Sequence, residues 1–440
     1  MNIRKLLIGF QAFAVAWLLI MPLQVFASDR HFRDARVFID TLRSISKGQQ
    51  AFRHDTFGDE VFWTDRLRLH EAIAGESLGG VGPGVDPATA LAVGLKVDVK
   101  ALPKRLQRAL KRGEVDLTDP ATTIALLQLD AVVGVKGEVT DSGRLESIGI
   151  TCALCHSTVD DSFTSGIGRR LDGWANRDLD VGVIISLAPD LSAFTDLLNV
   201  DEQTVRTVLT SWGPGKFDAS LLLDGKAFRP DGGSAAVLIP PAFGLAGINL
   251  HTWTGWGSIT HWNAFVATLE MGGQGTLYDP RLNDFDKFPI AAVNGFGDVR
   301  PEQDRVTPKL GVLQQYQLAL KAPKAPRGSY NKDAANRGKR VFEQQGDCAR
   351  CHVPPLFSEP GWNLHSPEEI GIDDFQARRG PEDSYRTAPL KGLWTHSKGG
   401  FYHDGRFATL MDVVEHYDTT FNLLLSQDAK SDLVEYLKSL

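Results

Sequence analysis

The sequence lacks a strong excess of charge of either sign, and it contains little cysteine. The 440 residues carry a formal net charge of −7, and such mild acidity disfavours nucleic acid as a partner. The glycine-rich run at 75–84 lacks the Gly-Lys-Ser/Thr ending of a phosphate-binding loop, so we interpret it as an ordinary loop. The chain has four cysteines, and all four belong to two short motifs.

Each motif reads Cys-x-x-Cys-His, which is the attachment signature of a covalently bound c-type haem. Two thiols three residues apart on one turn can each add to a haem vinyl group, and the following histidine then faces the iron. His156 and His352 are therefore the predicted proximal ligands, and no cysteine remains for a disulfide. The residues predicted to hold two c-type haems are Cys152, Cys155 and His156 in the first motif and Cys348, Cys351 and His352 in the second.

Two other kinds of site could use the same cysteines. Two Cys-x-x-Cys pairs can bind zinc, and a single pair can act as a redox dithiol. Haem attachment requires a histidine directly after each second cysteine, whereas zinc binding does not. The haem interpretation is therefore favoured over both alternatives.

Residues 1–27 have the pattern of a secretory signal peptide. Arg4 and Lys5 precede a long apolar run, and a cleavage pattern of the A-x-A type ends at Ala27. The run is long for a signal peptide, so an uncleaved membrane anchor is the alternative. Cleavage would remove two basic residues and change the net charge from −7 to −9. Export agrees with c-type haem attachment, which takes place outside the cytoplasmic membrane, and predicts a periplasmic bacterial protein without a stable membrane span.

The spacing of apolar residues predicts a mainly α-helical protein. Residues 28–140 form a helical N-terminal segment without cysteine, with helices expected at 31–45, 63–73 and 102–110. Around the second motif, a helix at 332–345 and a helix capped by Ser426 enclose the haem turn. An opening helix, a haem turn and a closing helix resemble a class I cytochrome c domain, which is predicted to span 331–440.

Part of this C-terminal domain is repeated earlier in the chain. The segment Pro240–Leu245 is echoed by Ala388–Leu393. Each segment is followed by a residue with an aromatic ring, one variable residue and a glycine, at Trp253–Gly255 and at His403–Gly405. A duplicated haem domain accounts for the repeat, so residues 141–330 are predicted to be a first cytochrome c domain.

The two motifs and the segment Arg386–Tyr417 resemble the bacterial di-haem cytochrome c peroxidase superfamily, which includes the enzymes that complete the tryptophylquinone cofactor of methylamine dehydrogenase. The N-terminal hundred residues lie outside the resemblance. It implies two class I cytochrome c-like haem domains and reduction of hydrogen peroxide at the first haem. The second haem would relay electrons from a small periplasmic redox protein or from a residue of a protein substrate.

The resemblance also implies roles for single residues. Trp253 matches the family's tryptophan between the haems, and Glu270 matches its catalytic glutamate, which takes a proton from peroxide and returns it to the leaving oxygen. Tyr417 occupies the position of the second haem's distal ligand, although a shift of one residue would bring His416 to the iron instead. Packing of an aromatic ring and a solvated helix end are the plain structural alternatives for Trp253 and Glu270.

Two features depart from the family's pattern. No histidine or methionine occurs between Ser157 and Val200, so the first iron is expected to be five-coordinate or water-bound. The residues 399–402 differ from the family's usual approach to the His-Asp-Gly turn, which leaves the family's interdomain calcium doubtful here. His54 and His70 could reach a haem edge, but such histidines are more often packed or solvated.

Other functions could use the same two haems. Rubber-cleaving di-haem dioxygenases resemble this chain in the long separation of the motifs and in an open first haem, and they act on dioxygen. A non-catalytic electron-transfer cytochrome would instead have two six-coordinate irons. An enzyme that modifies another protein is not separated from a peroxidase by sequence.

Overall fold

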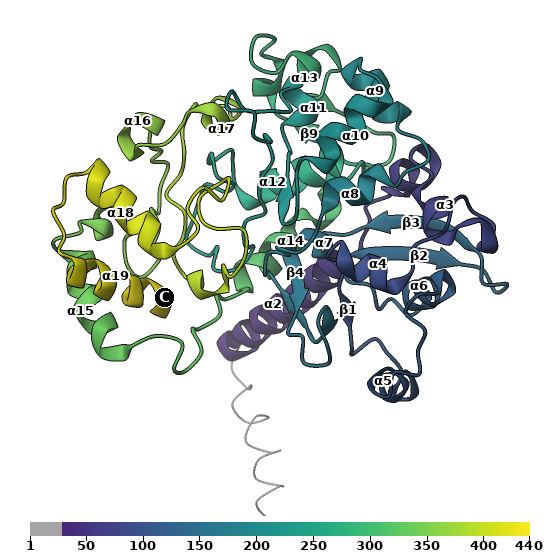
Figure 1. Ribbon diagram of the computed structural model, residues 1–440, viewed down its shortest axis with the longest axis horizontal. Coiled ribbons are helices and arrows are strands. Elements are labelled where there is room, and N and C mark those ends of the chain that lie inside the picture. Colours follow the sequence, from purple (N-terminus) through teal and green to yellow (C-terminus); the bar gives the residue numbers. More distant parts are fainter. Residues whose placement is uncertain (1–28) are drawn as a thin grey trace, which may run out of the picture.

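The computed structural model describes residues 29–440, so the predicted signal peptide lies outside the described residues. Helices dominate this part of the chain, and its strands are short and form two-stranded ribbons. Figure 1 shows most of the N-terminal elements at the lower right, the middle of the chain above and beside them, and the C-terminal helices at the left. The prediction of a mainly helical protein is confirmed.

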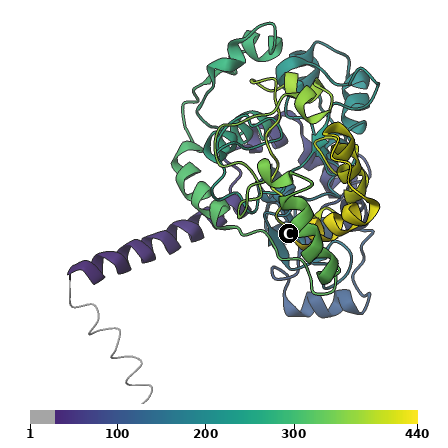
Figure 2. The same cartoon turned by 90° about the vertical axis from the view of Figure 1, so that its left-hand side faces the viewer.

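The N-terminal segment begins with α2 (Asp29–His54), whose first half extends away from the rest of the molecule (Figure 2). No helix within residues 29–440 is long and apolar enough to cross a lipid bilayer. The other elements of this segment are η1 (Val61–Arg66), α3 (Leu69–Ala74), η2 (Glu76–Leu78), α4 (Pro87–Ala92), β1 (Val97–Asp98), α5 (Lys104–Lys111), α6 (Pro120–Gln128) and β2 (Val135–Val139).

The helices expected in this segment are present, one of them with a break. α2 contains the helix expected at 31–45, and α5 covers most of 102–110. The helix expected at 63–73 is divided between η1 and α3, because Arg68 between them adopts a left-handed conformation with φ of 55°. A residue in that conformation ends the regular i to i−4 hydrogen bonding of a helix, while the apolar spacing continues across it.

The N-terminal segment and the first haem motif share one structural unit. β2 pairs with β3 (Leu145–Ile150), so this hairpin crosses position 141, where the sequence predicts the first haem domain to begin. β1 pairs in parallel with β5 (Ile167–Gly168), which lies beyond the motif. One hydrophobic core includes both Trp63 and Ala236. The N-terminal segment therefore forms one wall of the predicted first haem domain.

Short helices and ribbons surround the first motif. α14 packs along α2, and the two backbones approach so closely at Gly48 that a Cβ there would lie 2.0 Å from the carbonyl oxygen of Val312. The elements are α7 (Ala153–His156), β4 (Ser157–Val159), β6 (Arg170–Asp172), α8 (Val181–Ser186), α9 (Ser192–Leu198), α10 (Glu202–Thr210), β7 (Lys216–Phe217), α11 (Leu221–Asp224), β8 (Val237–Leu238), α12 (Ile259–Phe265), η3 (Val266–Glu270), β9 (Leu277–Tyr278), η4 (Pro280–Asn283), α13 (Pro289–Val293), β10 (Asp298–Val299) and α14 (Thr307–Ala319).

The C-terminal domain is built on a helix pair with its own core. α15 crosses α19 at Gly338, where a Cβ would lie 1.9 Å from the carbonyl oxygen of Asp432. Both helices expected here are present, and the Ser426 hydroxyl caps α19 by accepting a hydrogen bond from the amide of Ala429. The elements are α15 (Lys332–Glu343), η5 (Cys348–Arg350), α16 (Pro367–Ile370), α17 (Phe375–Arg378), η6 (Leu393–Thr395), α18 (Leu410–Thr420) and α19 (Gln427–Ser439).

The two repeated segments of the sequence adopt the same local structure. Each repeated turn is closed by an isolated antiparallel bridge, and each has a residue with positive φ just before its ring-bearing residue. The bridges join His251 to Gly257 and Phe401 to Phe407, and the residues with positive φ are Thr252 and Tyr402. The bridged residues lie at the same sequence distances from Trp253 as from His403, so the two segments are repeated in structure as well as in sequence.

A buried arginine joins the two predicted haem domains. Arg379, just after α17, is 1% exposed and donates hydrogen bonds to both carboxylate oxygens of Asp224, at 2.7 and 2.9 Å. The same guanidinium donates to Asp218 at 3.1 Å. Two buried carboxylates of the first domain thus depend on one cation of the second, which fixes how the domains dock.

Candidate haem sites

The first motif occupies a tight turn between two strands. β3 ends at Ile150, α7 carries the second half of the motif, and β4 begins directly after His156. The amide of His156 donates a hydrogen bond of 3.2 Å to the carbonyl oxygen of Cys152, which closes one helical turn. A single turn therefore carries both thiols and the imidazole, as covalent haem attachment requires.

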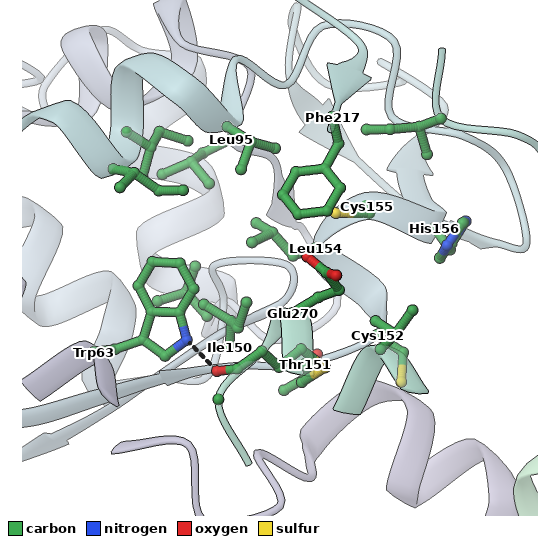
Figure 3. A pocket seen from close by; sticks show the side chains of 18 of the residues that line it. Trp63, Leu95, Ile150, Thr151, Cys152, Leu154, Cys155, His156, Phe217 and Glu270 are labelled. Atoms are coloured by element: carbon green, nitrogen blue, oxygen red, sulfur yellow. Dashed lines mark hydrogen bonds between the residues drawn. The ribbon is translucent and has the colours of Figure 1, made fainter. Parts of the chain in front are cut away.

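A cavity of about 1170 Å³ lies beside this turn (Figure 3). Cys152, Cys155 and His156 line it, together with apolar side chains such as Trp63 and Leu95 of the N-terminal segment. Ligand pockets usually measure about 300–1,000 Å³, so this cavity can hold a bulky and mostly apolar group. A porphyrin is such a group, and the cavity therefore fits the first predicted haem.

Burial sets the protonation of the first motif. It raises the pKa of the Cys152 and Cys155 thiols to about 12 and lowers the pKa of the His156 imidazole to about 4. The imidazole is therefore neutral at pH 7 and keeps the lone pair that binds a metal. Its Nδ1 atom makes no hydrogen bond of regular geometry within residues 29–440, but the nearby Pro240 carbonyl partly offsets the effect of burial.

The second motif repeats this arrangement. The amide of His352 donates a hydrogen bond of 2.9 Å to the carbonyl oxygen of Cys348, and its Nδ1 atom lies 3.3 Å from the carbonyl oxygen of Phe357. The Nε2 atom is thereby left for a metal. Burial lowers the pKa of His352 to about 4, and the Ala388 carbonyl lies beside the ring. Ala388 is the equivalent of Pro240, so both repeats place one carbonyl against a predicted ligand.

The two candidate distal ligands of the second haem lie side by side on α18 but have different partners. The Nε2 atom of His416 lies 2.9 Å from the carbonyl oxygen of Ile370 in α16. Tyr417 instead forms a hydrogen bond with Tyr402, which opposes the rise in its pKa that burial causes and to which the thiols of Cys351 and Cys348 add. Of the two side chains, Tyr417 is the one whose pKa the thiols of the second motif affect.

Glu270 ends η3 and directs its carboxyl into the first cavity (Figure 3). Its Oε1 atom is buried and has no hydrogen-bond partner in the described part of the chain. Burial raises the pKa of this carboxyl well above its ordinary value, and the nearby Asp218 adds to the rise. Glu270 is therefore not a solvated helix-end residue. A buried carboxyl without a partner costs stability, and it marks a candidate functional group.

Trp253 lies where the two domains meet. Its indole Nε1 donates a hydrogen bond of 2.8 Å to the carbonyl oxygen of Leu238. The amide of Leu238 in turn donates a hydrogen bond of 2.6 Å to the carbonyl oxygen of His403. The amide of Arg386 donates a hydrogen bond of 3.1 Å to the carbonyl oxygen of Trp253. Because Trp253 also lines the first cavity, it touches both the predicted first haem site and the second domain.

The cavity wall agrees with an open first haem in one respect. The residues at 157–200 that line it are all apolar except for one aspartate, and they are Ile167, Val181, Ile184, Ile185, Leu187, Ala193, Phe194, Asp196 and Leu197. His54 and His70 are not part of the lining, and His70 lies at a separate pocket beside Glu71. His251, which the sequence analysis did not select, does line the cavity.

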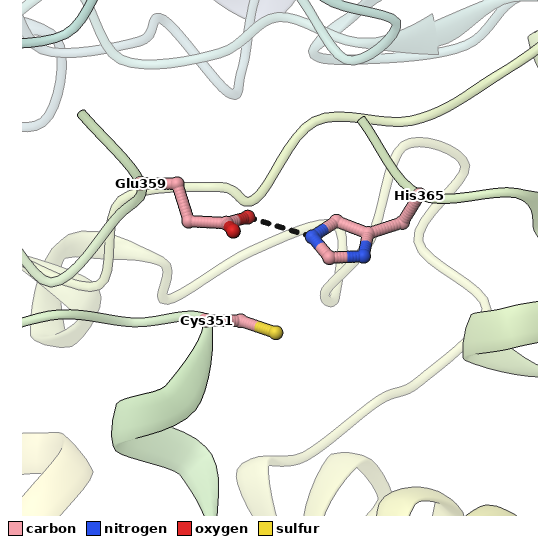
Figure 4. Close-up of side chains that lie close together, drawn as sticks. All are labelled: Cys351, Glu359 and His365. Carbon is pink, nitrogen blue, oxygen red and sulfur yellow. Dashed lines mark hydrogen bonds and ion pairs between the residues drawn. The ribbon is translucent and has the colours of Figure 1, made fainter. Parts of the chain in front are cut away.

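Two side-chain groups within residues 29–440 could each offer three atoms to one metal ion. One is Cys351, Glu359 and His365, where the His365 Nε2 atom lies 2.6 Å from a Glu359 oxygen (Figure 4). The four cysteines do not gather into such a group in the described chain, so the alternative of one zinc site built from both pairs is not formed. The other group is Asp373, His403 and Asp404.

The second group is already neutralised by arginine. Arg406 forms ion pairs with both Asp373 and Asp404, and Arg229 donates a second hydrogen bond to Asp404, at 2.7 Å. These carboxylates therefore serve the domain junction.

Sequence reasoning missed two buried arginines and an aromatic pair near the sites. Arg177 and Arg386 carry buried guanidinium nitrogens without partners among residues 29–440, and Arg386 lines the first cavity. Trp174 and Trp394 meet edge to face across the domain junction, with 5.3 Å between ring centroids. Haem propionates are carboxylates, so unpaired guanidinium groups at the cavity suit that cofactor. The residues present therefore fit a haem. Arg386 and Trp394 lie inside the segment Arg386–Tyr417 that carries the family resemblance, but nothing in the sequence indicated what these side chains would meet.

Comparison with known proteins adds little to this geometry. No protein-family model matches the sequence, and no curated protein matches it significantly. The structure of Kuenenia stuttgartiensis hydrazine synthase under 20 bar xenon is 20% identical, with a TM-score of 0.28 and coverage of 49% of this chain and 76% of that chain. A MauG-like protein associated with microbial copper homeostasis is 16% identical, with a TM-score of 0.30 and coverage of 49% and 77%. Both similarities are distant, so the interpretation depends on the residues of this chain.

Proposed function

We propose that this protein is a periplasmic di-haem c-type oxidoreductase that reduces hydrogen peroxide at the first haem with electrons relayed through the second. The observation that carries the proposal is the unpartnered Glu270 carboxyl, which faces the cavity lined by Cys152, Cys155 and His156. The proposal places the protein outside the cytoplasmic membrane, because c-type haem is attached there. The donor is a small redox protein or a residue of a protein substrate.

When bound, the haem of the first site would supply an iron that holds peroxide and exchanges electrons. Burial and the nearby Asp218 raise the pKa of Glu270 well above its ordinary value, which favours the protonated acid that gives a proton to the leaving oxygen. The resulting carboxylate can accept a proton from the next peroxide molecule. Reduction of one peroxide to two waters consumes two protons and two electrons. The apolar walls around Glu270 keep bulk water away from these transfers.

Stopped-flow absorption tests the proposal. One equivalent of peroxide is added to the mature protein with both irons ferric and no donor present. A fast change at the Soret band, slowed in Glu270→Gln, is expected. No response in either the ferric or the one-electron-reduced protein would contradict the peroxidase proposal and leave an electron carrier. Unchanged second-haem bands in Tyr417→Phe would exclude Tyr417 as a ligand, and the matched test is His416→Phe.

The apolar cavity favours a second candidate function. Many of its walls come from the N-terminal segment, including Leu69, Ile73 and Leu91, and hydrogen peroxide does not need such an apolar chamber. A dioxygenase that cleaves an apolar alkene would use it. Oxygen uptake that depends on an added polyisoprene oligomer, with carbonyl products identified by mass spectrometry, would support this function. Peroxide turnover without such uptake would support the peroxidase.

A further inference from the structure

Two arginines near the domain junction carry buried guanidinium nitrogens that lack the anions such groups require. Arg177 is 9% exposed, and none of its three guanidinium nitrogens has a hydrogen-bond partner within residues 29–440. Arg177 lies close to the first motif in space, because the amide of the preceding residue, Asn176, donates a hydrogen bond of 2.9 Å to the carbonyl oxygen of Cys155. A buried charge without a partner strongly destabilises a fold. Its presence therefore points to an anion that the protein binds.

Arg386 reaches in the opposite direction, from the second domain into the first cavity. Its Nε atom donates to the carbonyl oxygen of Thr252. Its Nη1 atom is buried and unpartnered among the described residues, and the side chain lines the cavity that contains His156. Burial lowers the pKa of both arginines to about 10, so both remain charged at neutral pH.

The charged neighbours of Arg177 do not supply the missing anion. Lys216 and His396 lie near enough for Arg177 to lower the pKa of each further, after burial as the main cause. The neighbouring acids are engaged elsewhere. Asp178 pairs with Lys96 and Lys398, and Asp404 pairs with Arg229 and Arg406. The junction therefore holds an excess of buried positive charge.

We propose that Arg177 and Arg386 bind carboxylates of the haem propionates and so fasten the cofactor to both domains at their junction. The inference rests on the haem sites of the proposed function. A guanidinium matches a carboxylate with two parallel hydrogen bonds, and the propionates are the anionic side groups of a haem. Arg386 binds the first haem, because it lines the cavity of the first motif. Arg177 binds a propionate of the second haem at the same junction.

Redox titration of the holoprotein tests this assignment. The variants are Arg177→Gln and Arg386→Gln, with Arg177→Lys and Arg386→Lys retaining the charge. Arg337→Gln is the matched control, because Arg337 pairs with Asp432 at the surface of α15. Loss of a cation beside a carboxylate favours the ferric state, and we expect at least a tenfold change in the ferric to ferrous ratio, about 59 mV for one electron. The potential should also acquire a pH dependence, because the freed propionate has a higher pKa.

Intact-mass spectrometry keeps this test separate from the proposed function. If two haems are attached and the potentials of both glutamine variants equal those of Arg337→Gln at every pH, the propionate assignment is wrong while the haem sites stand. If no haem is attached to the wild type, the proposed function itself fails. A wild-type potential that shifts on addition of phosphate or acetate, with no shift in the variants, would assign the guanidinium groups to a free anion and overturn the inference. If the glutamine variants do not fold, the lysine variants provide the test. We then expect them to keep the wild-type potentials and to melt at a lower temperature. Lysine variants with both the potentials and the melting temperature of the wild type would contradict the propionate assignment.

Discussion

Glu270 shows how one residue can carry a functional hypothesis. The resemblance to the peroxidase superfamily selected it in the sequence, but its burial and its lack of a hydrogen-bond partner are properties of the fold. Burial and the proximity of Asp218 raise the pKa of this carboxyl well above its ordinary value. In the folded state it binds a proton over a pH range in which the unfolded chain has released it, and this difference makes stability depend on pH.

Glu270→Gln should therefore flatten the pH dependence of stability. The folded pKa is raised, so above about pH 4.3 the wild type loses about 1.4 kcal/mol of unfolding free energy for each pH unit until the raised pKa is passed. Glutamine removes this loss, so the unfolding free energy of the variant should rise relative to that of the wild type between pH 5 and 7. Urea unfolding at both pH values measures the difference. The exposed Glu302→Gln is the control, and parallel pH profiles for the two variants would contradict the buried acid.

The same substitution should slow peroxide reduction. Loss of a positioned general acid typically reduces the rate about 10²–10⁴-fold. Peroxide turnover by the reconstituted holoprotein with an artificial electron donor measures the effect, and Glu302→Gln should turn over like the wild type. Equal turnover in Glu270→Gln would remove Glu270 from the reaction and leave only its effect on stability.

At the scale of elements, sequence patterns located helices better than their interruptions. The helix after Ser426 was predicted with its cap, because a hydroxyl at that position satisfies an amide left free at a helix start. The break at Arg68 was not predicted, since left-handed conformation in a non-glycine residue leaves no mark on apolar spacing. The β2–β3 hairpin was also missed, because strand pairing depends on contacts that helical periodicity does not report.

The crossing of α15 and α19 gives an element-scale prediction. Gly338→Ala should destabilise the C-terminal domain by about 1–3 kcal/mol, because the new Cβ would lie 1.9 Å from the carbonyl oxygen of Asp432 and force the helices apart. Gly311→Ala in α14 is the matched control, since it has open space around the Cβ position. That variant should be stabilised by about 0.5–1 kcal/mol. Chemical unfolding of both variants measures these changes in unfolding free energy. A Gly338→Ala variant as stable as the wild type would mean that the backbones of the two helices are not in contact.

At the scale of the whole molecule, the sequence predicted two haem domains but not their shared boundary. The repeat around Trp253 and His403 was recognisable in the amino-acid sequence, and in the structure both copies have the same isolated bridge and the same turn. The placement of Arg177, Arg379 and Arg386 could not be predicted, because each is isolated in sequence from the groups that it meets. Such charges are positioned by tertiary packing alone.

Removal of the interdomain cation should weaken the assembly. Arg379→Met leaves Asp218 and Asp224 buried without their counter-charge, so we expect a loss of about 3–5 kcal/mol. The exposed ion pair of Arg337 provides the comparison, and Arg337→Met should leave the denaturant midpoint close to that of the wild type. Denaturant midpoints of the two variants measure both effects. Equal midpoints would show that the domains dock without this contact.

Electron transfer between the domains tests the arrangement as a whole. Trp253 is hydrogen-bonded to Leu238 and joined to Arg386 through its backbone, whereas the Trp174–Trp394 pair offers a second aromatic contact across the junction. Phenylalanine fills a similar space but is much harder to oxidise than indole. Trp253→Phe should therefore slow inter-haem electron transfer tenfold or more, equivalent to about 1.4 kcal/mol in the barrier.

Trp394→Phe is the matched variant, because it removes an indole from the same junction without touching the Trp253 contacts. Stopped-flow reduction, followed separately at the bands of the two haems, gives the transfer rate in each variant. Slowing in Trp253→Phe alone would identify Trp253 as the relay. Slowing in Trp394→Phe alone would move the relay to the Trp174–Trp394 pair, and the resemblance that selected Trp253 would then describe its position in the repeated turn but not its role.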